Sequence, residues 1–257
     1  MSNALYVAWR AGTPELGTWS PVGKLEHIDG LYRFRYTRGA ESAGGFSGFV
    51  GMQDLKTVYE SDELFPLFAN RLLSKSRPEY EAWLTWSGFD PASPPEPLAI
   101  LGVTEGIRQT DHVEVFPCPT PDENGCYLSR FFVHGLRWMP DVAVERAGLL
   151  KPGEKLAIML DLQNPKDPHA VALRTIEGDR LMLGYAPRYM AYEFARLTIE
   201  CDFAEISVER VNAGAPMQMR VLCRMNACWP SAFRPCEQEV FQPLVSLPSD
   251  VEVSERA

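Results

Sequence analysis

Two strands and the turn between them are encoded by residues 155–175, KLAIMLDLQNPKDPHAVALRT. Apolar and β-branched residues dominate both ends of this stretch, as expected of strands that bury one face. The middle contains two prolines, an asparagine and two aspartates, a composition typical of a turn. We therefore expect neighbouring strands at 155–162 and 170–175 with a polar loop between them.

Short strands and turns continue on both sides of this pair. The pattern predicts further strands at Tyr127–Leu136, Leu181–Tyr185, Phe203–Val211 and Met217–Met225, and a helix at Arg188–Leu197. About six strands with one or two helices are typical of a small β-barrel. We expect this barrel domain to span residues 127–228.

The N-terminal part has a different character. Short aromatic and β-branched runs predict strands at Leu5–Trp9, Val22–Glu26 and Tyr32–Tyr36, with Asp29-Gly30 in the turn before the last of them. A proline opens a predicted short helix at Pro66–Leu73, and a second helix start follows at residue 76. A small sheet with helices before a barrel makes the predicted fold class α+β.

Prolines and glycine between the two parts mark a domain boundary. We expect an N-terminal domain at 1–117, a linker at 118–126, the barrel at 127–228 and a C-terminal extension at 229–257. The last dozen residues of the extension are polar and proline-containing, so we expect them to be disordered.

Charge is distributed unevenly along the chain. The net charge of −9 argues against bulk electrostatic binding to nucleic acid. Residues 1–126 carry 10 basic and 17 acidic side chains, whereas residues 127–228 carry 13 and 12. A phosphate-binding site is therefore expected in the second segment rather than the first.

The apolar runs and the six cysteines indicate the cellular compartment in which the protein is expected. No run approaches the length of a membrane span, and residues 1–10 lack the pattern of a signal peptide. We expect a cytoplasmic protein with no membrane partner, whose cysteines are free thiols.

Three motifs resemble those of one known family in order and separation. They are VHGLRW (133–138), DLQNPKDPHAV (161–171) and LGYAPR (183–188). Together they resemble the HIRAN domain, a module found in helicase-like proteins of replication-fork repair. The resemblance implies a barrel related to the OB-fold that holds the 3′ end of single-stranded DNA.

The chemistry of the motif residues fits that role. Arg137 offers a planar cation for phosphate, and Trp138 offers a ring face on which any base can stack. Asp167 can accept a hydrogen bond from a terminal hydroxyl while repelling a terminal phosphate. Tyr185 and Arg188 lie at a strand-to-helix corner that attracts anions. Family members often have an aromatic residue where this chain has Lys166, so here a phosphate contact replaces a stacking contact.

The N-terminal domain more weakly resembles the N-terminal subdomain of HipA-type kinases, through Val22-Gly23-Lys24-Leu25 and the Leu98–Gly102 segment. That resemblance implies a module that contacts a partner protein and brings no catalytic residue. No cofactor is expected, and the chain is expected not to be an enzyme.

Two alternatives to DNA binding stay open. One is an antitoxin-like or other protein-interaction regulator, which the acidic charge favours. The other is a metal-dependent nuclease built on Asp161, Asp167 and His169. Asp167 and His169 are two residues apart and share a strand face, but the sequence gives no third fixed ligand a reason to converge on them.

Overall fold

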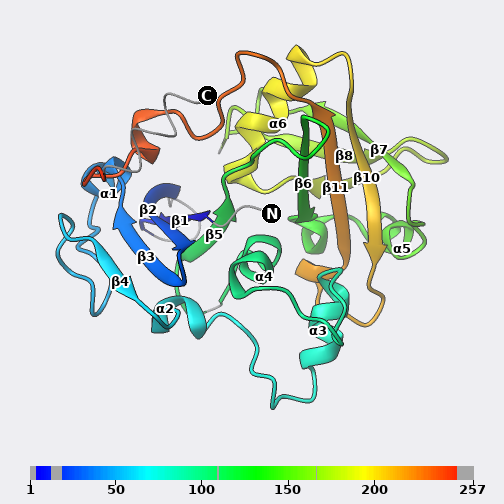
Figure 1. Ribbon diagram of the computed structural model, residues 1–257. Coiled ribbons are helices and arrows are strands. Elements are labelled where there is room, and N and C mark those ends of the chain that lie inside the picture. Colours follow the sequence, from blue (N-terminus) through cyan, green and yellow to red (C-terminus); the bar gives the residue numbers. More distant parts are fainter. Residues whose placement is uncertain (1–3, 13–18, 109, 166, 248–257) are drawn as a thin grey trace. The chain divides into compact units, whose positions relative to one another are not determined.

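The computed structural model describes residues 4–12, 19–108, 110–165 and 167–247 (Figure 1). It divides into two compact units, which are described separately. The first unit comprises residues 1–72, 97–118 and 236–257, and the second comprises 73–96 and 119–235. Residues 248–257, where the disordered end was expected, and Lys166 lie outside the described residues.

The first unit is built on a five-stranded antiparallel sheet of order β4-β3-β2-β1-β5. Its strands are β1 (Ala4–Arg10), β2 (Trp19–Ile28), β3 (Leu31–Tyr36), β4 (Tyr59–Ser61) and β5 (Val113–Pro117). Its helices are α1 (Arg38–Ser42), α2 (Pro66–Ala69), α4 (Pro97–Thr104) and the 3₁₀ turn η3 (Glu239–Phe241). The three predicted N-terminal strands are all present in this sheet.

The turn between β2 and β3 has the backbone that the sequence predicts. Asp29 and Gly30 both have positive φ, +53° and +79°, as a two-residue hairpin turn with right-handed strand twist requires. The alternation in β3 buries Tyr32, Phe34 and Tyr36. The helix predicted at Pro66–Leu73 is shorter than expected: α2 ends at Ala69.

The second unit is built on a six-stranded antiparallel sheet of order β6-β11-β10-β7-β8-β9. Its strands are β6 (Cys126–Phe132), β7 (Lys155–Leu160), β8 (Val171–Thr175), β9 (Met182–Tyr185), β10 (Ala204–Val211) and β11 (Val221–Cys228). Its helices are α3 (Tyr80–Trp86), α5 (Asp141–Gly148), α6 (Arg188–Glu200) and the 3₁₀ turns η1 (Leu136–Trp138) and η2 (Met217–Met219). The α+β fold and the curled sheet of the second half are thus confirmed. The predicted strand at Met217–Met225 begins later, at Val221, because η2 occupies its first residues.

Helix α6 covers the core of this curled sheet (Figure 1). Its buried residues recur at helical spacing, at Met190, Ala191, Phe194 and Leu197. The Phe194 ring packs against the Phe131 ring of β6 at a centroid distance of 5.1 Å. Helix α6 therefore has a fixed position, and its N-terminus lies directly after β9.

The compact units differ from the expected domains in two segments. Residues 73–96 pack in the second unit, because the guanidinium of Arg130 donates to the carbonyls of Ser87 and Gly88, at 3.0 and 3.2 Å. The C-terminal segment packs in the first unit, where the Phe241 ring lies 5.0 Å from the Tyr6 ring. Both additions depend on contacts between segments far apart in sequence. The predicted boundary at 118–126 contains one of the unit boundaries, between residues 118 and 119.

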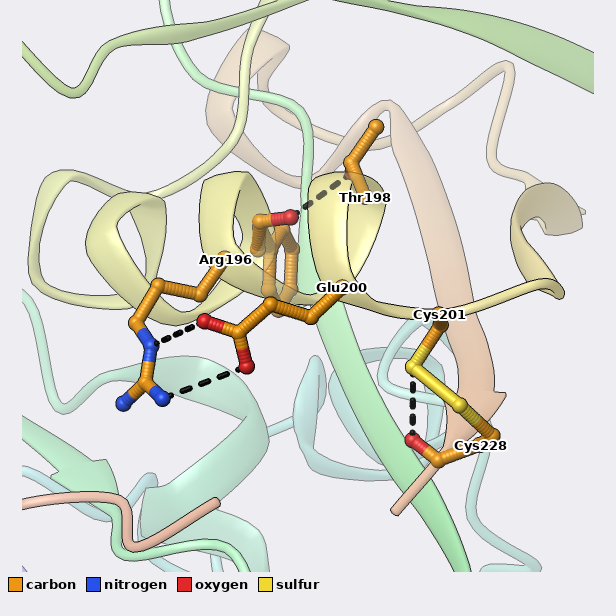
Figure 2. The surroundings of a disulfide bond; sticks show 6 residues. Arg196, Thr198, Glu200, Cys201 and Cys228 are labelled. Atoms are coloured by element: carbon orange, nitrogen blue, oxygen red, sulfur yellow. Dashed lines mark hydrogen bonds and ion pairs between the residues drawn. A yellow bond between two sulfur atoms is a disulfide. The ribbon is translucent and has the colours of Figure 1, made fainter. Parts of the chain in front are cut away.

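The expectation of six free thiols is wrong for two cysteines. Cys201, directly after α6, and Cys228, the last residue of β11, form a disulfide, with Cα atoms 5.8 Å apart (Figure 2). The Cys201 Sγ atom also lies 3.2 Å from the Cys228 carbonyl oxygen. The remaining cysteines are free thiols, namely Cys118, Cys126, Cys223 and Cys236. The disulfide forms because helix packing brings the end of α6 to the end of β11.

Within the described residues, no helix combines the length and the hydropathy that a membrane crossing needs.

Candidate nucleic-acid interface

One pair of backbone hydrogen bonds joins the two edges of the six-stranded sheet. The His134 N–H donates to the Tyr185 carbonyl at 2.8 Å, and the Tyr185 N–H donates to the His134 carbonyl at 2.9 Å. Gly184, with φ of +140°, makes this close approach possible, because a Cβ atom there would lie 2.2 Å from the His134 carbonyl oxygen. The first and third sequence motifs are therefore brought together at this closure.

Arg137 and Trp138 follow the closure on η1. Gly135 adopts φ of +78° and turns the chain out of the strand direction into this 3₁₀ turn. The Arg137 guanidinium carbon lies 4.7 Å from the centre of the Trp138 ring, and Trp138 is 73% exposed. Arg137 therefore makes a cation–π contact with an indole that is largely exposed.

The middle motif forms the loop between β7 and β8. Asp161 closes the start of the loop by donating its N–H to the Ala170 carbonyl at 2.9 Å. Its Oδ2 atom accepts hydrogen bonds from the Tyr185 hydroxyl, at 3.0 Å, and from the Asn164 amide, at 3.1 Å. Partial burial, together with this bond to a negatively charged acceptor, raises the pKa of Tyr185 above its ordinary value. Tyr185 thus ties the third motif to the second.

Asp167 lies in the same loop and faces the start of α6. Its Oδ1 atom accepts a hydrogen bond from the His169 N–H at 3.0 Å, which fixes the carboxylate. Its Oδ2 atom lies 3.8 Å from Nε of Arg188, the first residue of α6. The side chains of Asp167 and Arg188 are 15% and 39% exposed, respectively. This ion pair joins the second motif to the beginning of α6.

The structure therefore brings the candidate residues together in three groups. Arg137 stacks on Trp138, Tyr185 bonds to Asp161, and Asp167 pairs with Arg188. The backbone closure at residues 134 and 185 connects the first two groups. Lys166 was also predicted here, and it lies outside the described residues.

Two further residues contact the predicted site residues and were not themselves predicted. Asn164 supports Asp161, and Tyr192 presents its ring to the His169 ring at a centroid distance of 5.0 Å. Tyr192 lies one helical turn after Arg188, so an i, i+4 search along α6 could have found it. Asn164 lies three residues after Asp161, a spacing at which polar side chains in a turn can hydrogen-bond to each other, so the sequence contained a signal for this contact.

The residues considered for a metal site have other contacts. Asp161 accepts from Tyr185 and Asn164, and the His169 ring packs on Tyr192. Across the described part of the chain, no group of three or more histidine, cysteine, aspartate or glutamate side chains could hold a metal ion.

Comparisons with known proteins bear on this part of the chain. Residues 127–226 match the model of the HIRAN domain. A search of curated proteins finds no match. Solved structures similar to the chain include a protein from Lactobacillus plantarum, with 18% identity over 40% of this chain and 97% of that chain, and a TM-score of 0.32. They also include the HIRAN domain of human HLTF, with 18% identity over 41% of this chain and 81% of that chain, and a TM-score of 0.31. The resemblance of the N-terminal part to the N-terminal subdomain of HipA-type kinases stays a prediction. Over residues 127–226, the chain carries a HIRAN domain.

Proposed function

We propose that this protein binds nucleic acid through its HIRAN domain, and that its ligand is the 3′-hydroxyl end of single-stranded DNA. The observation that carries the proposal is the exposed Arg137–Trp138 stack, which lies on η1 next to the closure of the sheet. Proteins that bind single-stranded nucleic acid combine exposed aromatic rings, on which bases stack, with cations that pair with phosphates.

In this proposal the two parts of the stack have separate tasks. Trp138 stacks on a base and contributes about 1–3 kcal/mol without selecting the base. Arg137 neutralises one phosphate and releases its counterions. Because the Arg137 guanidinium already packs on the Trp138 ring in the free protein, both side chains lose little conformational entropy when DNA binds.

The Asp167–Arg188 pair selects the end of the strand in this proposal. The terminal 3′-hydroxyl donates to the Asp167 carboxylate, and Arg188 contacts the preceding phosphate. A 3′-phosphate is rejected, because it would bring up to two negative charges close to the same carboxylate. Lys166, which precedes Asp167 in the sequence, is proposed as a further phosphate contact.

The charge distribution supports this location. Residues 127–228 carry a net charge of +1, whereas the rest of the chain carries −10. A phosphate therefore meets less repulsion at the HIRAN domain than at the remainder of the molecule. We propose that residues outside this domain serve contacts with a partner protein in the cytoplasm.

Fluorescence anisotropy with a labelled single-stranded oligonucleotide tests the proposal. We expect Trp138→Ala to weaken binding about 5- to 150-fold with an unchanged salt dependence, and Trp138→Phe to retain most of the affinity, because stacking releases no counterions. Arg137→Ala should lower the salt slope by about one unit.

Lys155→Ala is the matched control for the loss of one cation. Lys155 begins β7, at the other end of the strand from the 161–170 loop, about 17–20 Å away. Equal effects of Arg137→Ala and Lys155→Ala, or full affinity in Trp138→Ala, would overturn the proposed interface.

A further inference from the structure

The first unit contains a cleft of about 470 Å³ that the nucleic-acid proposal does not use. Four segments form its walls, namely the end of β1 at Trp9, the glycine-rich loop 45–50, α2 with the following Asn70, and residues 111–113. All of these segments belong to the first compact unit. Its volume lies in the range of small-ligand sites.

Specific contacts shape the glycine-rich wall. The Tyr36 hydroxyl donates to the Met52 carbonyl at 2.5 Å and accepts from the Phe49 N–H at 2.7 Å. Gly48 has φ of +87°, and a Cβ atom there would lie 2.9 Å from the Gln53 backbone. These contacts hold the second half of this loop in one conformation, so this wall of the cleft is a built feature of the fold.

Aromatic rings line one side of the cleft. The rings of Trp9 and Phe46 lie 5.2 Å apart at an angle of 54°, and Phe46 meets Phe49 edge to face at 5.1 Å. Trp9 and Phe46 are only partly buried, so ring surface remains open to the cleft. Such a wall suits a flat group or a cation.

The polar side is rich in hydrogen-bond acceptors. Asp111 is fixed by the buried Arg71, whose Nη2 atom lies 2.7 Å from Oδ2, and by the Val113 N–H, 3.1 Å from Oδ1. Each carboxylate oxygen retains a further lone pair, and the side chain is 33% exposed. Asn70 and His112 also line the cleft.

The charge of the cleft excludes an anionic ligand. None of its described lining residues is lysine or arginine. The first unit as a whole carries nine basic and sixteen acidic side chains, a net charge of −7. The Arg71 guanidinium behind the wall is already paired with Asp111, so a phosphate or carboxylate would meet no unpaired lysine or arginine among the lining residues, whereas the acidic surroundings of the unit attract a cation.

We infer that this cleft binds the guanidinium of an arginine side chain presented by a partner polypeptide. A guanidinium has five donors and no acceptor, which complements the acceptor-rich side, and its flat faces stack on Trp9 and Phe46. A lysine ammonium is strongly hydrated and lacks that planar face, so it fits less well. The inference concerns the first unit and does not depend on DNA binding by the second.

Nuclear magnetic resonance and calorimetric titration of the full chain with capped single residues test the inference. N-acetyl-arginine methylamide should shift the Trp9 indole N–H resonance, which the Trp9→Phe variant assigns. The capped citrulline probe, which has the same shape without the charge, should bind at least tenfold more weakly, and the capped lysine probe should also bind more weakly. Similar affinity for the arginine and citrulline probes would overturn the inference.

Variants separate the cleft from the general acidity of the unit. Asp111→Asn and Asn70→Leu should each weaken the arginine probe about tenfold. The matched control Asp62→Asn, an exposed carboxylate outside the lining residues, should leave its affinity unchanged. Asn70 is exposed directly after α2, so Asn70→Leu keeps the test available if Asp111→Asn disturbs the buried Arg71. Equal effects of Asn70→Leu and Asp62→Asn would contradict the assignment.

Titration with free arginine distinguishes an arginine side chain of a polypeptide from the free amino acid as the ligand. Its charged carboxylate meets no cation in the cleft, so we expect it to bind more weakly than the capped probe. Tighter binding of free arginine, or binding of inorganic phosphate at the same resonances, would exclude a polypeptide partner of this chemistry.

Discussion

The Oδ2 atom of Asp167 lies 3.8 Å from Nε of Arg188, so two residues expected to act on opposite groups of a DNA end are paired with each other in the free protein. The pair holds the β7–β8 loop against the start of α6. A ligand that contacts both residues exchanges this ion pair for a hydroxyl on one side and a phosphate on the other. The cost is modest, because Arg188 is partly exposed and such pairs contribute little.

Asp167→Asn tests the role of this carboxylate. We expect affinity for a 3′-hydroxyl strand to stay within about threefold, because the asparagine Oδ1 atom still accepts a hydrogen bond from the hydroxyl while the competing ion pair with Arg188 is lost. Affinity for a 3′-phosphate strand should rise, because the repelling charge is removed. Anisotropy titrations with the two matched oligonucleotides measure both changes.

Asp202→Asn is the control for the same change in net charge. Asp202 lies just beyond the other end of α6, about 20 Å from Arg188 along the helix axis. If both variants change the ratio of the two affinities equally, the effect comes from overall charge and not from Asp167.

Gly184→Ala tests the closure of the sheet. The new Cβ atom would lie 2.2 Å from the His134 carbonyl oxygen, so the strand ends must separate. We expect a loss of about 1–3 kcal/mol or more in the free energy of unfolding, and weaker DNA binding, because η1 moves away from β9. Urea unfolding followed by circular dichroism gives the stability change.

Gly148→Ala provides the comparison for this substitution. Gly148 ends α5, and an added Cβ atom there meets no atom within 4 Å. It should be neutral or slightly stabilising. A Gly184→Ala protein as stable as Gly148→Ala would show that residues 134 and 185 do not hold the sheet closed.

Much of this arrangement could be predicted from the sequence, because it depends on local patterns. The strands around the 161–170 loop follow from apolar runs, and the β2–β3 turn follows from Asp29-Gly30. Arg137 and Tyr185 come close through backbone hydrogen bonds between His134 and Tyr185. Backbone bonds leave no side-chain pattern in the sequence, so only the family resemblance could predict this proximity.

Other features depend on contacts that no local pattern encodes. The packing of residues 73–96 in the second unit depends on Arg130, more than forty positions away from its partners Ser87 and Gly88. The Cys201–Cys228 disulfide could not be selected from six cysteines, because spacing alone does not define a pairing. The cleft in the first unit combines segments from residue 9 to residue 113, which the sequence gives no reason to group.

Cys201→Ser should destabilise the second unit. The disulfide closes a loop between residues 27 positions apart, for which loop entropy predicts a contribution of about 3.5 kcal/mol. It joins the end of α6, where Arg196 and Glu200 also pair at 2.9 Å, to the end of β11 (Figure 2). Calorimetry with and without dithiothreitol should show a lower melting temperature for the reduced wild type.

The variant and the reductant must act through the same bond. Dithiothreitol should therefore have no further effect on Cys201→Ser, while Cys126→Ser, which removes a free thiol, should keep the full response of the wild type. An unchanged melting temperature of the wild type on reduction would contradict a stabilising disulfide.

Alkaline unfolding tests the hydrogen bonds of Tyr36 behind the cleft. Burial raises the pKa of Tyr36 from the ordinary value of 10 to about 12. The unfolded state therefore loses this proton at lower pH than the folded state, and the associated stability is complete below pH 10 and lost as the pH rises towards 12. Urea unfolding at stepped pH should show this decrease, and Tyr36→Phe should be less stable at neutral pH, by about 1–3 kcal/mol, with a smaller decrease above pH 10. A pH dependence identical to that of the wild type would exclude Tyr36 as its source.

The central claim is tested most directly by one comparison on the wild-type protein. Anisotropy titrations at fixed salt should use one single-stranded sequence in two forms, with a 3′-hydroxyl or a 3′-phosphate, and a circular strand that has no end. The account predicts at least tenfold tighter binding of the 3′-hydroxyl form than of the other two. Equal affinity for all three would contradict end recognition by Asp167 and Arg188, even if the Arg137–Trp138 stack still bound the strand.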